Sequence, residues 1–178
     1  EQIPGERYYT GQRLKVYVVR VEQTARGPQI VLSRAHAQMV KHLFELEVPE
    51  IEAGTVEIVG IAREAGIRSK VAVKSNASGV DAVGTFVGGR GSRVQAVMSD
   101  LGEEKIDIIP YSDDPQIFIA NALSPTKVAS VELDEQDRKV RRTLGIASLG
   151  GHAWVPIDDE NCWAFSMNWH PARPLAED

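Results

Sequence analysis

The feature that most constrains the fold is the loop Gly88-Gly89-Arg90-Gly91, which separates two short runs of helical periodicity. Before the loop, one helical stripe carries Val83, Phe86 and Val87, and after it apolar residues recur at helical spacing over 94–101. Because glycine has no Cβ, a ligand can approach such a backbone closely, and the amides at the start of the following helix suit a phosphate. The loop alone is compatible with two interpretations, a phosphate-binding loop and a tight turn without a ligand.

The order of the elements around the loop favours the first interpretation. A helical pattern begins at Ala35 and ends before Pro49, which disfavours helical conformation at the residue preceding it. Three strands are expected, at 55–63, 68–74 and 105–110. Residues 36–110 therefore predict an α+β unit of order α-β-β-α-α-β, with two helices laid over a three-stranded sheet. This is the order of the bacterial-type (type II) KH domain, whose GxxG loop binds single-stranded nucleic acid.

Basic residues gather on the hairpin that precedes the loop. Lys70 and Lys74 share one face of the strand at 68–74, and Arg63 and Arg68 flank its turn. We expect this hairpin to lie close to the glycine loop. The alternative for the two lysines is that they only solvate the outer face of the sheet. Ser92 is expected to be the N-cap of the helix after the loop.

Composition limits the remaining classes of function. The net charge of −5 argues against a general polyanion binder but leaves room for a local basic patch. The single cysteine, Cys162, excludes an intramolecular disulfide framework and fits a cytoplasmic protein. No apolar stretch is long enough to span a membrane. His36 and His42 have no second ligand nearby, so we expect a helix boundary or surface there and no metal site.

Several longer phrases closely resemble the NusA family of bacterial transcription termination/antitermination factors. They occur at 29–34, 43–51, 81–84, 91–97, 104–109 and 121–125. The resemblance covers about residues 1–139 and implies three parts. These are the end of an OB-type RNA-binding barrel (1–34), a complete first KH domain (36–110) and a truncated second KH domain (111–140).

The resemblance also implies a function and a set of contacts. It implies non-catalytic binding of single-stranded RNA, the nascent transcript, with RNA polymerase and other transcription factors as partners of the full-length family protein and no cofactor. Val83, Phe86 and Val87 are either core residues or apolar side chains that pack against bases. The expected RNA contacts are Gly88, Gly89, Arg90, Gly91, Ser92 and Arg93, with Lys70 and Lys74 as weaker candidates.

The second half of the chain departs from that family. After a helix at 113–123 and a strand at 127–133, residues 134–139 turn toward a partner strand that we do not expect to follow. Residues 141–178 form an unrelated tail, interpreted as a chimeric or frame-shifted junction near residue 140 or as an engineered fusion.

Within the tail, residues 151–175 resemble a piece of the catalytic domain of Rieske-type ring-hydroxylating oxygenases. One cysteine cannot hold that family's iron–sulfur cluster. His152, Asp158, Asp159 and His170 do not match its iron-ligand pattern. An iron-dependent oxygenase fragment and a protein-interaction scaffold are the alternatives to RNA binding.

Overall fold

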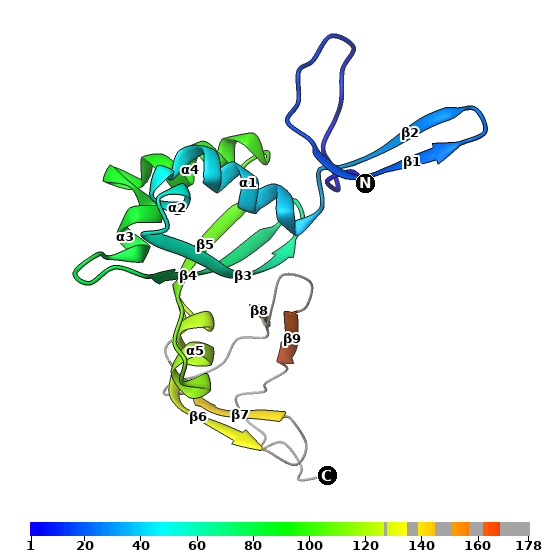
Figure 1. The fold of residues 1–178 in the computed structure, drawn as a ribbon. Helices are drawn as coiled ribbons and strands as arrows, with labels where there is room; N and C mark the ends of the chain where they lie inside the picture. The colour runs from blue at the N-terminus through cyan, green and yellow to red at the C-terminus, as the bar shows by residue number, and fades with distance from the viewer. Residues whose placement is uncertain (127, 135–138, 145–150, 157–161, 168–178) are drawn as a thin grey trace.

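The protein is described by a computed structural model, which covers residues 1–126, 128–134, 139–144, 151–156 and 162–167. A three-stranded sheet of order β3-β4-β5 organises its central part (Figure 1). Strand β3 (Val56–Glu64) pairs antiparallel with β4 (Arg68–Ser75), and β4 pairs parallel with β5 (Lys105–Pro110). Parallel neighbours need a crossover rather than a tight turn. The glycine loop and its two helices form that crossover, so the predicted α-β-β-α-α-β order is confirmed.

Helices cover one face of this sheet. They are α1 (Ala37–Glu47), the short α2 (Pro49–Glu52), α3 (Ala82–Val87) and α4 (Ser92–Asp100) (Figure 1). Phe44 of α1 and Phe86 of α3 are fully buried, with ring centroids 5.4 Å apart. Val71 and Val73 of β4 join them in the same apolar core. Phe86 is therefore a core residue and not a side chain available to bases.

The ends of α1 follow from local chemistry. His36 is the N-cap, and its Nδ1 accepts a hydrogen bond from Gln38 N at 3.1 Å. Tyr17 stacks on both His36 and the exposed His42, which confirms the boundary and surface positions expected for the two histidines. Val48 has φ −125°, so α1 ends before Pro49 as predicted. Pro49 then starts α2, a helix that we did not predict, because proline suits the first helical position.

A second group of elements lies on the opposite face of the sheet from α1 and α4 (Figure 1). Asp114 caps α5 (Pro115–Ala122) by accepting from Gln116 N at 2.8 Å. Strand β6 (Val128–Asp134) follows and pairs antiparallel with β7 (Lys139–Leu144). The expectation that no partner strand follows residue 139 was therefore wrong.

The apolar residues of α5 and β6 pack against β5 of the three-stranded sheet. Ile109 of β5 forms a buried cluster with residues of α5, β6 and the segment between them, namely Ile119, Ala122, Leu123 and Val131. As a result, residues on both faces of β4 are buried, including Lys70 and Ala72 as well as Val71 and Val73.

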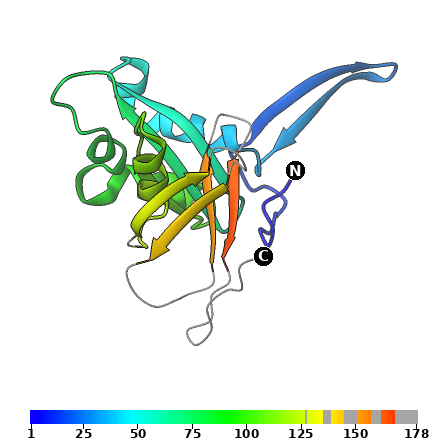
Figure 2. The same ribbon diagram turned by 90° about the horizontal axis from the view of Figure 1, so that it is seen from below.

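Two further hairpins complete the described elements. Strands β1 (Tyr17–Thr24) and β2 (Gly27–Ser33) form the first, and it projects away from the sheet in both views (Figures 1 and 2). Its exposed large apolar residues include Val18, Val21, Ile30 and Leu32. The OB-barrel origin of this hairpin stays a prediction. In the tail, β8 (Gly151–Pro156) pairs antiparallel with β9 (Cys162–Met167).

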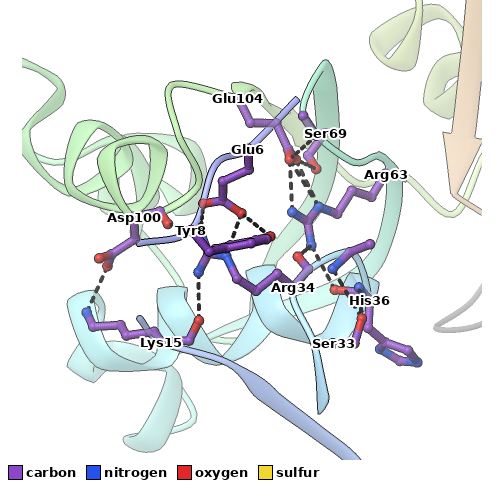
Figure 3. Close-up of polar contacts among 12 residues, drawn as sticks. Glu6, Tyr8, Lys15, Ser33, Arg34, His36, Arg63, Ser69, Asp100 and Glu104 are labelled. Atoms are coloured by element: carbon purple, nitrogen blue, oxygen red, sulfur yellow. Dashed lines mark hydrogen bonds and ion pairs between the residues drawn. The ribbon is translucent and has the colours of Figure 1, made fainter. Parts of the chain in front are cut away.

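A buried ion pair connects the sheet to the end of the crossover (Figure 3). Arg63 Nη2 donates to Glu104 Oε2 at 2.9 Å, and the two side chains are 2% and 0% exposed. Glu104 also accepts from Ser69 Oγ at 2.6 Å and from Gly66 N at 2.7 Å. Arg63 Nη1 donates to two backbone carbonyls, those of Arg34 at 2.8 Å and His36 at 2.9 Å. Strand β3 is thus fastened both to the start of β5 and to the segment that enters α1.

A second arginine fastens the N-terminal segment (Figure 3). Arg34 Nε donates to Glu6 Oε2 at 2.7 Å, Nη1 to Lys15 O at 2.6 Å and Nη2 to Asp100 O at 2.9 Å. The hydrogen bond from Arg34 holds the pKa of Glu6 below its ordinary value, against the opposing effect of burial. The carboxylate of Glu6 is therefore ionised at neutral pH and holds residues 1–15 near α4.

Replacing Glu104 with glutamine should lower the free energy of unfolding by about 3 kcal/mol, because Arg63 would keep a buried charge without a counter-charge. Urea denaturation measures this. Glu22→Gln breaks the exposed pair with Arg20 and serves as the control, with an expected change of less than about 0.5 kcal/mol. Equal losses in both variants would contradict the structural role of Glu104.

Glu6→Gln should destabilise the protein at neutral pH by about 1–2 kcal/mol, through loss of a charge-assisted hydrogen bond. The folded-state pKa of Glu6 is lowered from 4.5, so its stabilisation is present above that pH and is lost as pH falls through the folded-state value. Denaturation of both proteins between pH 7 and pH 3 should show the stability difference shrinking below about pH 4.5. A difference that stays constant with pH would contradict this prediction.

Candidate nucleic-acid interface

The glycine loop has an unusual backbone. Gly88 has φ 76° and ψ 171°, Arg90 has φ 55° and ψ 28°, and Gly91 has φ 79° and ψ 13°. Residues other than Gly, Asn and Asp rarely adopt the left-handed backbone conformation of Arg90, and residues in this conformation cluster at functional sites. Gly89 and Arg90 are both exposed. The loop therefore presents backbone and one guanidinium to solvent, immediately before α4.

The structure requires two of the three glycines of the loop. A Cβ at Gly88 would lie 2.8 Å from Arg93 Cγ and 3.0 Å from Arg93 N, so this glycine is required inside the molecule. Gly91 requires its positive φ. Gly89 has neither constraint, because its φ lies outside the left-handed region and no atom lies within 4 Å of an added Cβ. Nothing in the described part of the chain demands a glycine at position 89. A ligand that approaches the backbone closely from outside would explain why this position carries a glycine.

Ser92 is exposed, and the prediction that it is the N-cap of α4 was wrong. Gly91 occupies the N-cap position, and no side chain makes a cap hydrogen bond there. The reason is the short 3-10 turn over Gly89–Gly91, in which Ser92 N donates to Gly89 O and Ser92 already has helical φ and ψ. The Ser92 side chain stays free of a capping role, and a contact with phosphate remains a prediction.

Arg93 points away from the exposed tip of the loop. Its Nη1 donates to Thr85 O at 2.8 Å and its Nη2 to Glu50 Oε1 at 3.0 Å. The side chain is 27% exposed. This partner was not predicted, because Glu50 lies in α2, a helix that we did not expect. Pro49 was the signal for that helix, since proline favours the first helical position.

Lys70 is placed far from the role expected of it. Its Nζ donates to Ala122 O at 2.7 Å and to Ser124 O at 2.9 Å, at the end of α5, and lies 3.5 Å from Asp107 Oδ2. The side chain is 7% exposed, and burial lowers the pKa of its ammonium. Neither the RNA-contact nor the solvated-face interpretation describes this lysine, which instead holds α5 against the sheet.

Arg63, Lys74 and the β3–β4 turn also make contacts away from the glycine loop. Arg63 is buried against Glu104, and the β3–β4 turn meets the chain after α4, where Lys105 N donates to Ile67 O at 3.2 Å. The glycine loop precedes α4, so the expectation that this hairpin turn lies beside the loop was wrong. Lys74, half-buried, lies with its Nζ 5.6 Å from the ring centroid of Tyr111.

The described residues also bear on two other classes of site, metal sites and membrane-spanning segments. Among the described residues, no group of three or more His, Cys, Asp or Glu side chains could hold a metal ion. None of the described helices is long and apolar enough to cross a membrane. Of the tail residues considered for an iron site, Asp158, Asp159 and His170 lie outside the described residues. The side chain of His152 in β8 is likewise not described.

The fold and the loop together define a KH domain of type II, with parallel β4 and β5 joined through two helices and a GxxG loop. Residues 34–111 match the family model of the NusA-like first KH domain. This match contains every residue of the loop and of both helices beside it.

Curated relatives extend the match beyond this domain. The NusA protein of Mycobacterium tuberculosis is 56% identical over 144 residues, which are 81% of this chain and 42% of the relative. The protein of Thermus thermophilus is 54% identical over 141 residues, 79% of this chain and 36% of the relative. The NusA protein of Bacillus subtilis is 52% identical over 138 residues, which are 78% of this chain and 37% of the relative.

The chain is therefore a NusA homologue that includes the first KH domain, as its sequence phrases suggested. It spans about two fifths of the length of these relatives. Each of them is named a transcription termination/antitermination protein, and the expectation of a non-catalytic protein agrees with that assignment.

The different demands on the glycines can be tested by stability alone. Gly88→Ala should lower the free energy of unfolding by about 1–3 kcal/mol, through a positive φ and a clash with Arg93. Gly89→Ala should change it by less than about 0.5 kcal/mol, because the position is open and exposed. Thermal unfolding followed by circular dichroism measures both. Similar losses at the two positions would contradict this division.

Proposed function

We propose that this chain binds single-stranded RNA through residues 88–92, with the backbone at Gly89 approaching the RNA and Arg90 pairing with phosphate. The observation that carries the proposal is the pairing of an open, exposed glycine with an exposed arginine in left-handed conformation. A guanidinium forms charge-assisted hydrogen bonds to phosphate oxygens, and KH domains bind RNA through this loop.

The start of α4 supports the same assignment. Helix α4 is nine residues long, and its N-terminal amides follow directly on the loop. The positive end of the helix dipole favours a phosphate at that point. The local arrangement is thus suited to an anion even though the whole chain has a net charge of −5.

Within a longer factor, this binding would hold the nascent transcript while the rest of the protein contacts RNA polymerase and other transcription factors. The relatives' name as transcription termination/antitermination proteins supports this role. A single KH unit makes few phosphate contacts, so the affinity should be modest and should fall with rising salt.

Fluorescence anisotropy with a short labelled single-stranded RNA tests the proposal. Arg90→Asp should weaken binding at least about tenfold, because one charge-assisted contact is lost and a repulsion is added. Gly89→Asp/Arg90→Asp should weaken it further, because the added side chain occupies the space through which RNA approaches.

Lys105→Asp is the control for Arg90→Asp. It makes the same change of charge at an exposed residue of β5, beyond the far end of α4. Its effect on RNA binding should be small at moderate salt. Equal affinities of the unmodified chain and the double variant would overturn the proposed function.

A further inference from the structure

Arg93 lies behind the glycine loop and connects three helices. It starts in the first turn of α4, donates to the Thr85 carbonyl of α3 and donates to the Glu50 carboxylate of α2. Its Cγ occupies the space that a Cβ on Gly88 would need. The arginine side chain therefore runs directly beneath the first residue of the loop.

We propose that the Glu50–Arg93 pair positions the RNA-binding loop, and that Arg93 acts on RNA through the loop rather than by touching a phosphate. This inference rests on the proposed function. It assigns to Arg93 a role different from the phosphate contact that the family resemblance implies.

The loop has few contacts of its own to define its shape. Gly91 N donates to Gly88 O at 3.1 Å, and Ser92 N donates to Gly89 O. Helix α3 before it has only six residues, too few to be stable without packing. Anchoring α3 and α4 to α2 through one guanidinium fixes the two ends of the loop relative to each other. A loop held in its binding conformation loses less entropy when RNA binds.

The charge of Glu50 argues in the same direction. Its own backbone N–H and then Arg93 hold the pKa of this carboxyl below its ordinary value, so it is ionised at neutral pH. A carboxylate 3.0 Å from the guanidinium offsets the positive charge that Arg93 would otherwise present to a phosphate. Arg90 has an exposed guanidinium at the loop tip and is the residue placed to meet the anion.

Two glutamate variants separate positioning from electrostatics. Glu50→Ala should weaken binding of a short single-stranded RNA about fivefold, although it removes a negative charge beside an anion site. Glu52→Ala is the matched control, since it removes the same charge from an exposed position of the same helix, and it should leave affinity unchanged or slightly raised. Unchanged or tighter binding by Glu50→Ala would overturn the proposal.

The salt dependence of binding distinguishes the two arginines. Arg90→Gln should reduce the slope of log affinity against log salt by about 0.7, the value for one phosphate contact on a single strand. Arg93→Gln should weaken binding and leave the slope unchanged. Arg93→Lys keeps the charge, but a lysine ammonium cannot reproduce the geometry in which the guanidinium donates to both Thr85 and Glu50, so this variant should weaken binding as well. A slope reduced equally by Arg93→Gln and Arg90→Gln would show a direct phosphate contact and overturn the positioning role.

Amide hydrogen exchange reports on the loop without any RNA. In the intact chain, exchange at residues 88–92 should be about tenfold faster in Glu50→Ala than in the unmodified protein, and unchanged in Glu52→Ala. Exchange at Val71 and Val73 in the sheet serves as the folding control. Unchanged exchange in the loop would refute the positioning role. Failure of the unmodified chain to bind RNA would instead refute the proposed function.

Discussion

The buried pair of Arg63 and Glu104 is the interaction on which the arrangement of the domain depends. It joins the outer strand of the sheet to the point where the crossover re-enters it, and every nitrogen of the guanidinium head has an acceptor. Two buried charges are stable only when such a network is complete. Because Glu104 fixes the chain just after α4, it also limits where the other end of that helix can lie, and the glycine loop is attached to that other end.

Much of the fold could be predicted from short-range patterns. The expected strand at 105–110 has the bounds of β5, and Pro49 ends α1 as expected, because alternation and proline act on neighbouring residues. The glycine loop could be located for the same reason, because its glycines and the helical patterns on both sides are local features. Ser92 shows the limit of this reasoning, since the left-handed conformation of Gly91 displaced it from the cap position.

Side chains whose partners are distant in sequence could not be placed in this way. Arg93 meets a carboxylate 43 positions earlier, and Lys70 meets a carbonyl 52 positions later. An alternating strand shows which side chains share a face, but it does not show whether water or another helix covers that face. Lys70 on the second face of β4 therefore suggested an exposed surface, whereas in the structure the end of α5 covers it.

The contact of Lys70 with the end of α5 has a consequence for where the first domain ends. The ammonium of Lys70 is surrounded by the carbonyls of Ala122, at the end of α5, and Ser124, just after it, and by the carboxylate of Asp107. A cut at residue 110 would follow the family boundary closely, yet it would remove both carbonyl acceptors of Lys70 and leave Asp107 as the remaining partner of its ammonium, on a face of β4 where Ala72 would also become exposed. Residues 36–110 therefore depend on the chain around the end of α5 to satisfy a buried ammonium, so the sequence module alone lacks contacts that stabilise it.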